Sequence, residues 1–262
     1  MLIIRSLLLV LCVVGVTTVR ASEREAPRAL SPQEKATLHA DEVVGRAMFV
    51  SDRAATVATD AALKLDAFRQ ESRVRGWITQ AHADAVTVTF IDATPAALYR
   101  ATVSNDGKLV GKVEAYATPL PLSAFEAGAV AARTVALGAK FPPCSARYNT
   151  VVLPLDASSA GKWLVYLLPA TTQPSVIPIG GTSRVTVDHG TIVAQRPFTK
   201  SCIALENDPR AVALMISHLL DTTPTEAHVF WSLWAHKDMY VSTESAAWAI
   251  HDGRIRLVET GH

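Results

Sequence analysis

The chain has 262 residues, a formal net charge of +1 at pH 7, and a hydrophobic fraction of 49%. This near-neutral balance, with no run of Lys and Arg, argues against nucleic-acid binding, which needs a clustered basic surface. The apolar fraction is ample for a packed interior, and the size allows one large domain or two of ordinary size.

The first 21 residues predict a secretory signal peptide. Arg5 precedes an apolar run over residues 6–16, and Val19 and Ala21 occupy the positions that define cleavage after Ala21. The run is too short for a retained membrane span, and no later segment is long and uncharged enough to be one. We therefore expect a periplasmic or secreted protein with no transmembrane anchor after cleavage. Loss of Arg5 and Arg20 would leave a mature charge of about −1.

Two cysteines remain after the predicted cleavage, which removes Cys12. An exported chain enters an oxidising compartment, so we expect a disulfide between Cys144 and Cys202. The alternative is a pair of buried free thiols.

For the first half of the mature chain, the sequence predicts a helix, four strands and a second helix. Ser31 and Glu34 form a capping-box pattern, and an apolar stripe continues to about Phe68. From Val74 the hydrophobic period changes to two, which predicts an antiparallel meander with a turn at residues 104–107. A second capping-box pattern at Ser123 predicts a helix that ends near residue 138.

The proline-containing segment GAKFPP, residues 138–143, is the predicted domain boundary, which gives domains at 22–140 and 141–262. The second domain reads as short strands over residues 148–198, a helix from Asp208 to about Asp221, and strands near residues 227–235, 239–243 and 247–257. Strands outnumber helices and are joined by tight turns. We therefore predict an α+β protein with antiparallel sheets: an N-terminal helix plus meander, then a strand-rich C-terminal half.

The densest group of chemically useful side chains lies in residues 217–238. His218 and Asp221 share a face at the end of the predicted helix, and Glu226 and His228 share a face of the strand predicted next. If the helix end packs beside the strand, two imidazoles and two carboxylates converge, and these are ligand types used by zinc and similar ions.

Other interpretations of the same residues stay open. Asp221 with Thr222 or Thr223 can cap the helix end, with the histidines as ordinary structural residues, or a carboxylate can orient His228 without any metal. The spacing matches no established metalloenzyme signature, and no motif requires a cofactor. The chain also has no Gly-x-Ser-x-Gly nucleophile motif. Ser183 is interpreted as a residue at the start of a strand and not as a nucleophile.

Aromatic residues on the same predicted strand suggest a binding face. Phe230, Trp234 and His236 would point to the same side as Glu226 and His228, and exposed aromatic rings provide contact area for sugars or peptides. The alternative is that they belong to the core, as most strand tryptophans do.

Four segments of the second half resemble a group of exported Gram-negative bacterial proteins with no established activity. They are YNTVVLP, GKWLVYLLPAT, IGGTSRVTVDHGTIVAQRPFTKSCIAL and SHLLDTTPTEAHVFWSLWA, and the likeness covers mainly residues 144–258. The resemblance implies an exported, periplasmic setting and a recurring C-terminal module, and it transfers no site.

Two functional hypotheses follow from the sequence. The first is a non-catalytic envelope protein that binds a protein or cell-wall component through an antiparallel sheet face. The second is a metal-dependent hydrolase that uses His218, Asp221, Glu226 and His228 around a metal-bound water.

Overall fold

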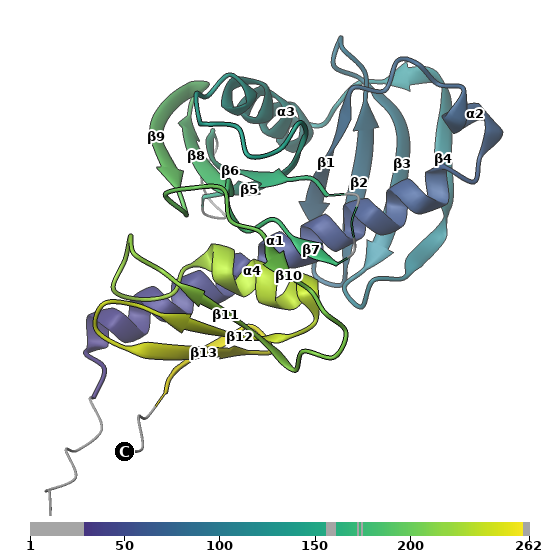
Figure 1. Ribbon diagram of the computed structural model, residues 1–262. Coiled ribbons are helices and arrows are strands. Elements are labelled where there is room, and N and C mark those ends of the chain that lie inside the picture. The colour runs from purple at the N-terminus through teal and green to yellow at the C-terminus, as the bar shows by residue number, and fades with distance from the viewer. Residues whose placement is uncertain (1–28, 156–160, 172, 174, 259–262) are drawn as a thin grey trace, which may run out of the picture. The chain divides into compact units, whose positions relative to one another are not determined.

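Four helices and fourteen strands make up the part of the chain that the computed structural model describes, which is residues 29–155, 161–171, 173 and 175–258 (Figure 1). The predicted α+β class is confirmed. The predicted signal peptide and Cys12 lie outside the described residues. Over those residues, no helix is both long and apolar enough to cross a membrane.

Helix α1 (Pro32–Ala62) begins where the sequence predicts. The Ser31 side chain accepts from the Glu34 backbone N–H at 3.2 Å, and the Glu34 carboxylate accepts from the Ser31 N–H at 2.9 Å. The predicted helical stretch to Phe68 is divided, because α1 ends at Ala62 and a short helix, α2 (Asp66–Arg69), follows.

The first sheet is an antiparallel meander in the order β1-β2-β3-β4, as predicted. Its strands are β1 (Gly76–Ala81), β2 (Ala85–Ile91), β3 (Ala97–Ser104) and β4 (Leu109–Leu120). Small residues of α1, including Ala54 and Ala58, pack against Val86, Val88 and Phe90 on one face of this sheet. The opposite face carries more polar side chains and is partly covered by α3.

Helix α3 (Ala124–Leu137) starts at a second capping box, in which Ser123 accepts from the Glu126 N–H. It packs on one face of the second sheet, whose order is β5-β6-β8-β9, against Trp163, Val165 and Val185. The strands of this antiparallel sheet are β5 (Tyr148–Pro154), β6 (Lys162–Pro169), β8 (Ser183–Asp188) and β9 (Thr191–Pro197). The short strands β7 (Val176–Ile177) and β10 (Leu205–Glu206) pair separately.

The third sheet has the order β11-β12-β13-β14 and contains a parallel pair. Strand β11 (Ala213–Ser217) is parallel to β12 (Asp238–Ser242), and α4 (Glu226–Ala235) forms the crossover between them, while β13 (Ala247–His251) and β14 (Arg254–Leu257) continue as antiparallel strands. Leu214 and Ile216 are buried, whereas Met215 and Ser217 are exposed.

The predicted helix from Asp208 to Asp221 is therefore wrong. Asp208 caps a turn instead, because its carboxylate accepts from the Arg210 N–H at 2.9 Å and its carbonyl accepts from the Ala211 N–H at 2.9 Å. The chain then enters β11. Buried and exposed side chains alternate along this strand, so one of its faces is exposed to solvent.

Helix α1 also contacts the last described hairpin. Glu42 accepts from the Ile255 N–H at 2.7 Å, and Arg46 donates to the Gly253 carbonyl at 2.7 Å. Gly45 lets α1 approach α4 closely, since a Cβ there would lie 2.5 Å from the Val229 Cβ. The described residues from 31 to 258 belong to one compact unit, in which α1 packs on elements from both sides of the predicted boundary at residues 140/141. The division into domains at 22–140 and 141–262 stays a prediction.

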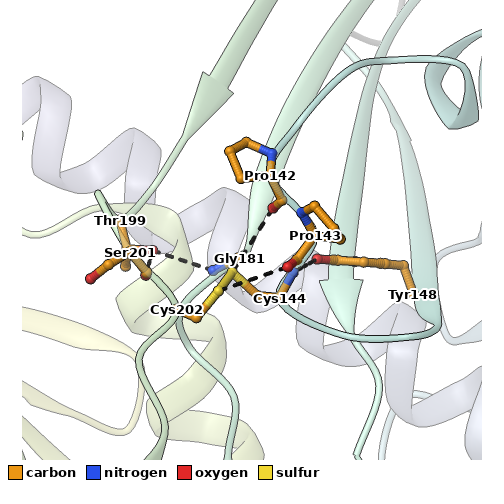
Figure 2. Close-up of a disulfide and its surroundings, with 8 residues drawn as sticks. All are labelled: Pro142, Pro143, Cys144, Tyr148, Gly181, Thr199, Ser201 and Cys202. Carbon is orange, nitrogen blue, oxygen red and sulfur yellow. Dashed lines mark hydrogen bonds between the residues drawn. A yellow bond between two sulfur atoms is a disulfide. The ribbon is translucent and has the colours of Figure 1, made fainter.

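Cys144 and Cys202 form the predicted disulfide (Figure 2). The Cys144 backbone N–H donates to the Tyr148 hydroxyl at 2.7 Å, which fixes the chain as it enters β5. Gly181 has a φ of +90°, and a Cβ at this position would lie 2.5 Å from the Cys144 Cβ. A glycine is therefore required for the close approach of this turn to the bridge.

Candidate functional site

Helix α4 carries two of the four predicted catalytic side chains, and it replaces the predicted strand at residues 227–235. Thr225 precedes the helix, and its backbone N–H donates to Nδ1 of His228 at 3.1 Å, so His228 helps to cap the first turn. The predicted strand face shared by Glu226, His228, Phe230, Trp234 and His236 is therefore wrong. A short apolar run such as VFWSLWA gives no periodic signal that separates a buried helix from a buried strand.

His218 and Asp221 lie together in the loop after β11. The His218 backbone N–H donates to the Ser242 carbonyl at 2.7 Å. The Nε2 atom of the His218 side chain lies 2.8 Å from a carboxylate oxygen of Asp221. The His218 ring meets the His228 ring edge to face, with 4.6 Å between the centroids. The structure thus brings His218, Asp221 and His228 together.

Glu226 is held by the second sheet, on the face opposite α3. Its Oε1 accepts from the Tyr166 hydroxyl at 3.1 Å and from Arg184. Tyr166 pairs in register with Arg184, and Arg184 with Arg196, so these three side chains form one row across β6, β8 and β9. Glu226 is 1% exposed, which makes these donors essential for a buried carboxylate.

Arg196 and Asp41 complete the group. Arg196 donates to Asp221 at 2.8 Å, and the Asp41 side chain on α1 lies beside the Glu226 carboxylate. We call the eight residues Asp41, Tyr166, Arg184, Arg196, His218, Asp221, Glu226 and His228 the buried polar cluster. The sequence interpretation missed Asp41, Tyr166, Arg184 and Arg196. The sequence did contain one sign of Arg184, because it is a charged residue within the otherwise uncharged segment SRVTV.

Burial sets the protonation of this cluster. Desolvation, followed by the charges of His218 and Arg196, lowers the pKa of His228 to about 3. His228 is therefore a neutral imidazole at pH 7, and because Nδ1 accepts from Thr225, its proton is on Nε2. Desolvation and the Glu226 carboxylate raise the pKa of Asp41 to about 8, in spite of the nearby Arg184 and Arg196.

The most deeply buried members of the cluster are His218, Glu226 and His228, which are at most 3% exposed. His218 is paired with Asp221, Glu226 Oε1 with Tyr166, and His228 Nδ1 with Thr225 outside the cluster. In the described part of the chain, no three His, Cys, Asp or Glu side chains are arranged to hold a metal ion. The cluster connects α1, the second sheet and α4.

The three predicted binding residues do not form a common aromatic surface. Phe230 is 1% exposed and belongs to the core. Trp234 is half-buried and meets Trp231 edge to face at 5.4 Å. His236 is exposed, and it ends α4 in a left-handed conformation with a φ of 53°.

An open pocket of about 580 Å³ lies on the polar face of the first sheet, opposite α1. Its polar lining comes from strands β1–β4, the residue after β1, and the start of α3: Gln80, His82, Thr87, Arg100, Thr102, Lys112, Glu114, Ser123 and Glu126. In-register pairs Gln80–Thr87 and Thr87–Thr102 place three of these side chains in one row. The sequence interpretation did not identify this pocket, because residues from all four strands contribute to it.

A bulge in β4 shapes the pocket wall. The pairing of β3 with β4 shifts between Arg100 and Thr102, opposite Gly111 and Lys112, and Gly111 has a φ of +73°. Bulges of this kind redirect side chains and are common beside functional sites. Lys112 is exposed, lines the pocket, and makes no ion pair with any residue that the structure describes.

Arg100 and Glu126 in the pocket neutralise each other, whereas Glu114 is hydrogen-bonded but keeps its charge. Arg100 donates to both carboxylate oxygens of Glu126 at 3.2 and 2.9 Å, and Glu114 accepts from the Tyr116 hydroxyl at 2.7 Å. The wall therefore presents a cation, a carboxylate and several hydroxyl and amide groups side by side, a set that suits a small polar ligand with charges of both signs.

Comparison of the chain with protein-family models, with curated proteins and with solved structures finds no match.

Proposed function

We propose that the protein is an exported, non-catalytic binding protein of the cell envelope that takes up a cell-wall peptide in the pocket of the first sheet. The observation that carries this proposal is the polar pocket itself, with Lys112 in its wall and no ion pair to Lys112 from the part of the chain that the structure describes. Its volume of about 580 Å³ is in the range of small-molecule sites. The peptide stems of cell-wall fragments carry carboxylates and amino groups, which Lys112 and Glu114 complement.

The burial of the predicted catalytic residues supports a binding role over catalysis. His218, Glu226 and His228 are enclosed and hydrogen-bonded to neighbouring protein groups, whereas the pocket is open. Export is supported by the disulfide, which is a bond typical of oxidising compartments. Mass spectrometry of the protein purified from a periplasmic extract should give a chain that begins at Ser22, and a chain that begins at Met1 would contradict export.

Calorimetric titration with a soluble cell-wall fragment, a disaccharide carrying a short peptide, tests the pocket. Lys112→Ala should weaken binding at least fivefold, since it removes a charge-assisted contact. Lys108→Ala removes the same charge four residues away, outside the pocket lining, and should bind like the wild type. Equal affinities of the two variants, or no binding by the wild type at millimolar ligand, would overturn the proposal.

The metal-dependent hydrolase stays a prediction. Metal analysis of the protein purified without chelators tests it, because the hypothesis requires about one equivalent of zinc, manganese or iron. Substitution of His228 by Gln should then remove the metal.

A further inference from the structure

Arg133 on α3 is a half-buried arginine without a counter-charge. Its Nε donates to the Thr150 hydroxyl at 2.9 Å, and neither Nη atom has a hydrogen-bond acceptor or an ion pair among the residues that the structure describes. Burial lowers the pKa of the guanidinium, which remains protonated at neutral pH. Removing water from a cation without supplying an anion costs a folded chain free energy.

The other half-buried arginines in the described part of the chain are each compensated. Arg53 donates to the Asn105 carbonyl and lies over the Phe49 ring. The remaining ones form ion pairs with carboxylates: Arg46 with Glu42, Arg100 with Glu126, Arg184 with Glu226, and Arg196 with Asp221. Arg133 differs from all of these because both of its Nη groups are left available.

The surroundings of Arg133 hold its guanidinium in one place. Helix α3 contacts β1 of the first sheet and β5 of the second, and Arg133 contacts Gly76 at the start of β1 and Thr150 in β5. Gly76 has a φ of +149°, and a Cβ there would lie 2.6 Å from Nη2 of Arg133. A side chain at position 76 would therefore displace the guanidinium. Because the bond to Thr150 uses Nε, the Nη end of the guanidinium stays open.

The open Nη end suits a carboxylate. Solvent reaches both Nη atoms, since neither belongs to the buried polar atoms that lack a partner, whereas Arg184 Nε does. The two N–H groups at the end of a guanidinium match the two oxygens of a carboxylate. Burial alone accounts for the lowered pKa of Arg133, so no second cation of the described chain acts on this position. A single positive charge favours a carboxylate over a phosphate group, whose charge is about −1.5 to −2 at pH 7.

We propose that Arg133 binds the carboxylate group of a small organic acid through its two Nη groups, at the seam where α3 contacts β1 and β5. Arg133 is not part of the pocket lining, so this site is separate from the pocket that carries the proposed function. A bound carboxylate neutralises a charge that the described chain leaves uncompensated. Occupancy should therefore stabilise the folded protein.

Thermal unfolding in sodium acetate and in sodium chloride at equal ionic strength tests the site. Acetate should raise the melting temperature of the wild type by about 3–5 °C relative to chloride, the shift expected at roughly ten times the dissociation constant. Arg133→Gln should lose this difference, whereas Arg256→Gln, which removes an exposed arginine from β14, should keep it. Equal differences in the two variants, or no difference in the wild type, would overturn the proposal.

Nuclear magnetic resonance of the wild type makes the test independent of how well Arg133→Gln folds. The Arg133 Nε–H resonance is identified by its absence from the spectrum of Arg133→Lys. It should shift with added acetate and saturate, with half of the change at about 10 mM, and it should not shift with chloride. A resonance that acetate leaves unmoved would contradict the site, and tighter binding of sodium phosphate than of acetate would contradict its selectivity for a carboxylate.

Discussion

Asp41 on α1 lies beside Glu226 on the first turn of α4, so two carboxyl groups are neighbours. Burial and the charge of Glu226 disfavour the ionised form of Asp41 and raise its pKa to about 8, so this side chain carries a proton at pH 7. Glu226 Oε2 is buried and has no hydrogen-bond partner among the described residues. Protonated Asp41 is a donor close to this carboxylate.

The raised pKa of Asp41 predicts that the protein loses stability at alkaline pH. Its pKa is about 8 when folded and 3.8 in its ordinary state, so the folded protein binds the proton more tightly and the free energy of unfolding falls as pH rises through this window. Between pH 6.5 and 8 we expect a fall of about 1–2 kcal/mol in urea titrations. Asp41→Asn should flatten this profile, whereas Asp60→Asn, at an exposed position of the same helix, should not.

His228 predicts the opposite dependence on the acid side. Its pKa is about 3 when folded and 6.5 in its ordinary state, so the unfolded chain takes up the proton first and stability falls as pH drops from about 6.5 towards 3. Asp41, together with Asp52, whose pKa burial raises to about 6, opposes this loss in part of the same range.

The substitution His228→Gln isolates that contribution. Glutamine at this helix position can still cap Thr225 but does not titrate. Relative to the wild type, the variant should gain stability as pH is lowered from 6.5 to 4, measured by urea midpoints. His39→Gln, at an exposed position on α1, is the control, and an identical pH profile for His228→Gln and the wild type would contradict a neutral buried imidazole.

Replacing Gly45 by alanine should have the opposite effect on stability from the one that helix propensity predicts. Alanine normally stabilises a helix relative to glycine by about 0.5–1 kcal/mol. At Gly45 the new Cβ would lie 2.5 Å from the Val229 Cβ and 2.7 Å from the Glu226 carbonyl oxygen, so Gly45→Ala should instead destabilise the protein by about 1–3 kcal/mol. Ala40→Gly, at an exposed position of α1, reports the propensity difference alone. A stabilised Gly45→Ala variant would rule out the close contact of α1 with α4.

The disulfide predicts a large effect on unfolding. Its cysteines are 58 positions apart, and closing a loop of this length stabilises a protein by about 4 kcal/mol in the chain-entropy treatment. Cys144→Ala with Cys202→Ala should lower the free energy of unfolding by up to that amount. In thermal melts, reductant should destabilise the wild type by the same amount as the double substitution does. It should leave the melting temperature of the double variant unchanged.

Local signals in the sequence were sufficient for the elements that local interactions determine. Ser31 and Ser123 mark helix starts because each capping box is complete within four residues. The meander and its turns were predicted for the same reason, since alternation and turn residues are neighbours in the chain. The region from Asp208 to His236 was predicted wrongly, because its helix is short and buried, its strand is also short, and both depend on tertiary packing.

The candidate sites needed information that no single segment contains. His218, Asp221, Glu226 and His228 were identified as a group because they are close in sequence. Their partners were not, because the row of Tyr166, Arg184 and Arg196 exists only once three strands are aligned in register. The pocket likewise depends on the alignment of four strands and a bulge.

The hydrogen bond between Glu42 and Ile255 joins residues 213 positions apart. A ribosome adds roughly 5–20 residues per second, so the helix that contains Glu42 is made on the order of 10 to 40 seconds before its partner. During that interval the apolar stripe of this helix lacks its final covering. The contact between Glu42 and Ile255 therefore forms only after the last hairpin has been added to the chain.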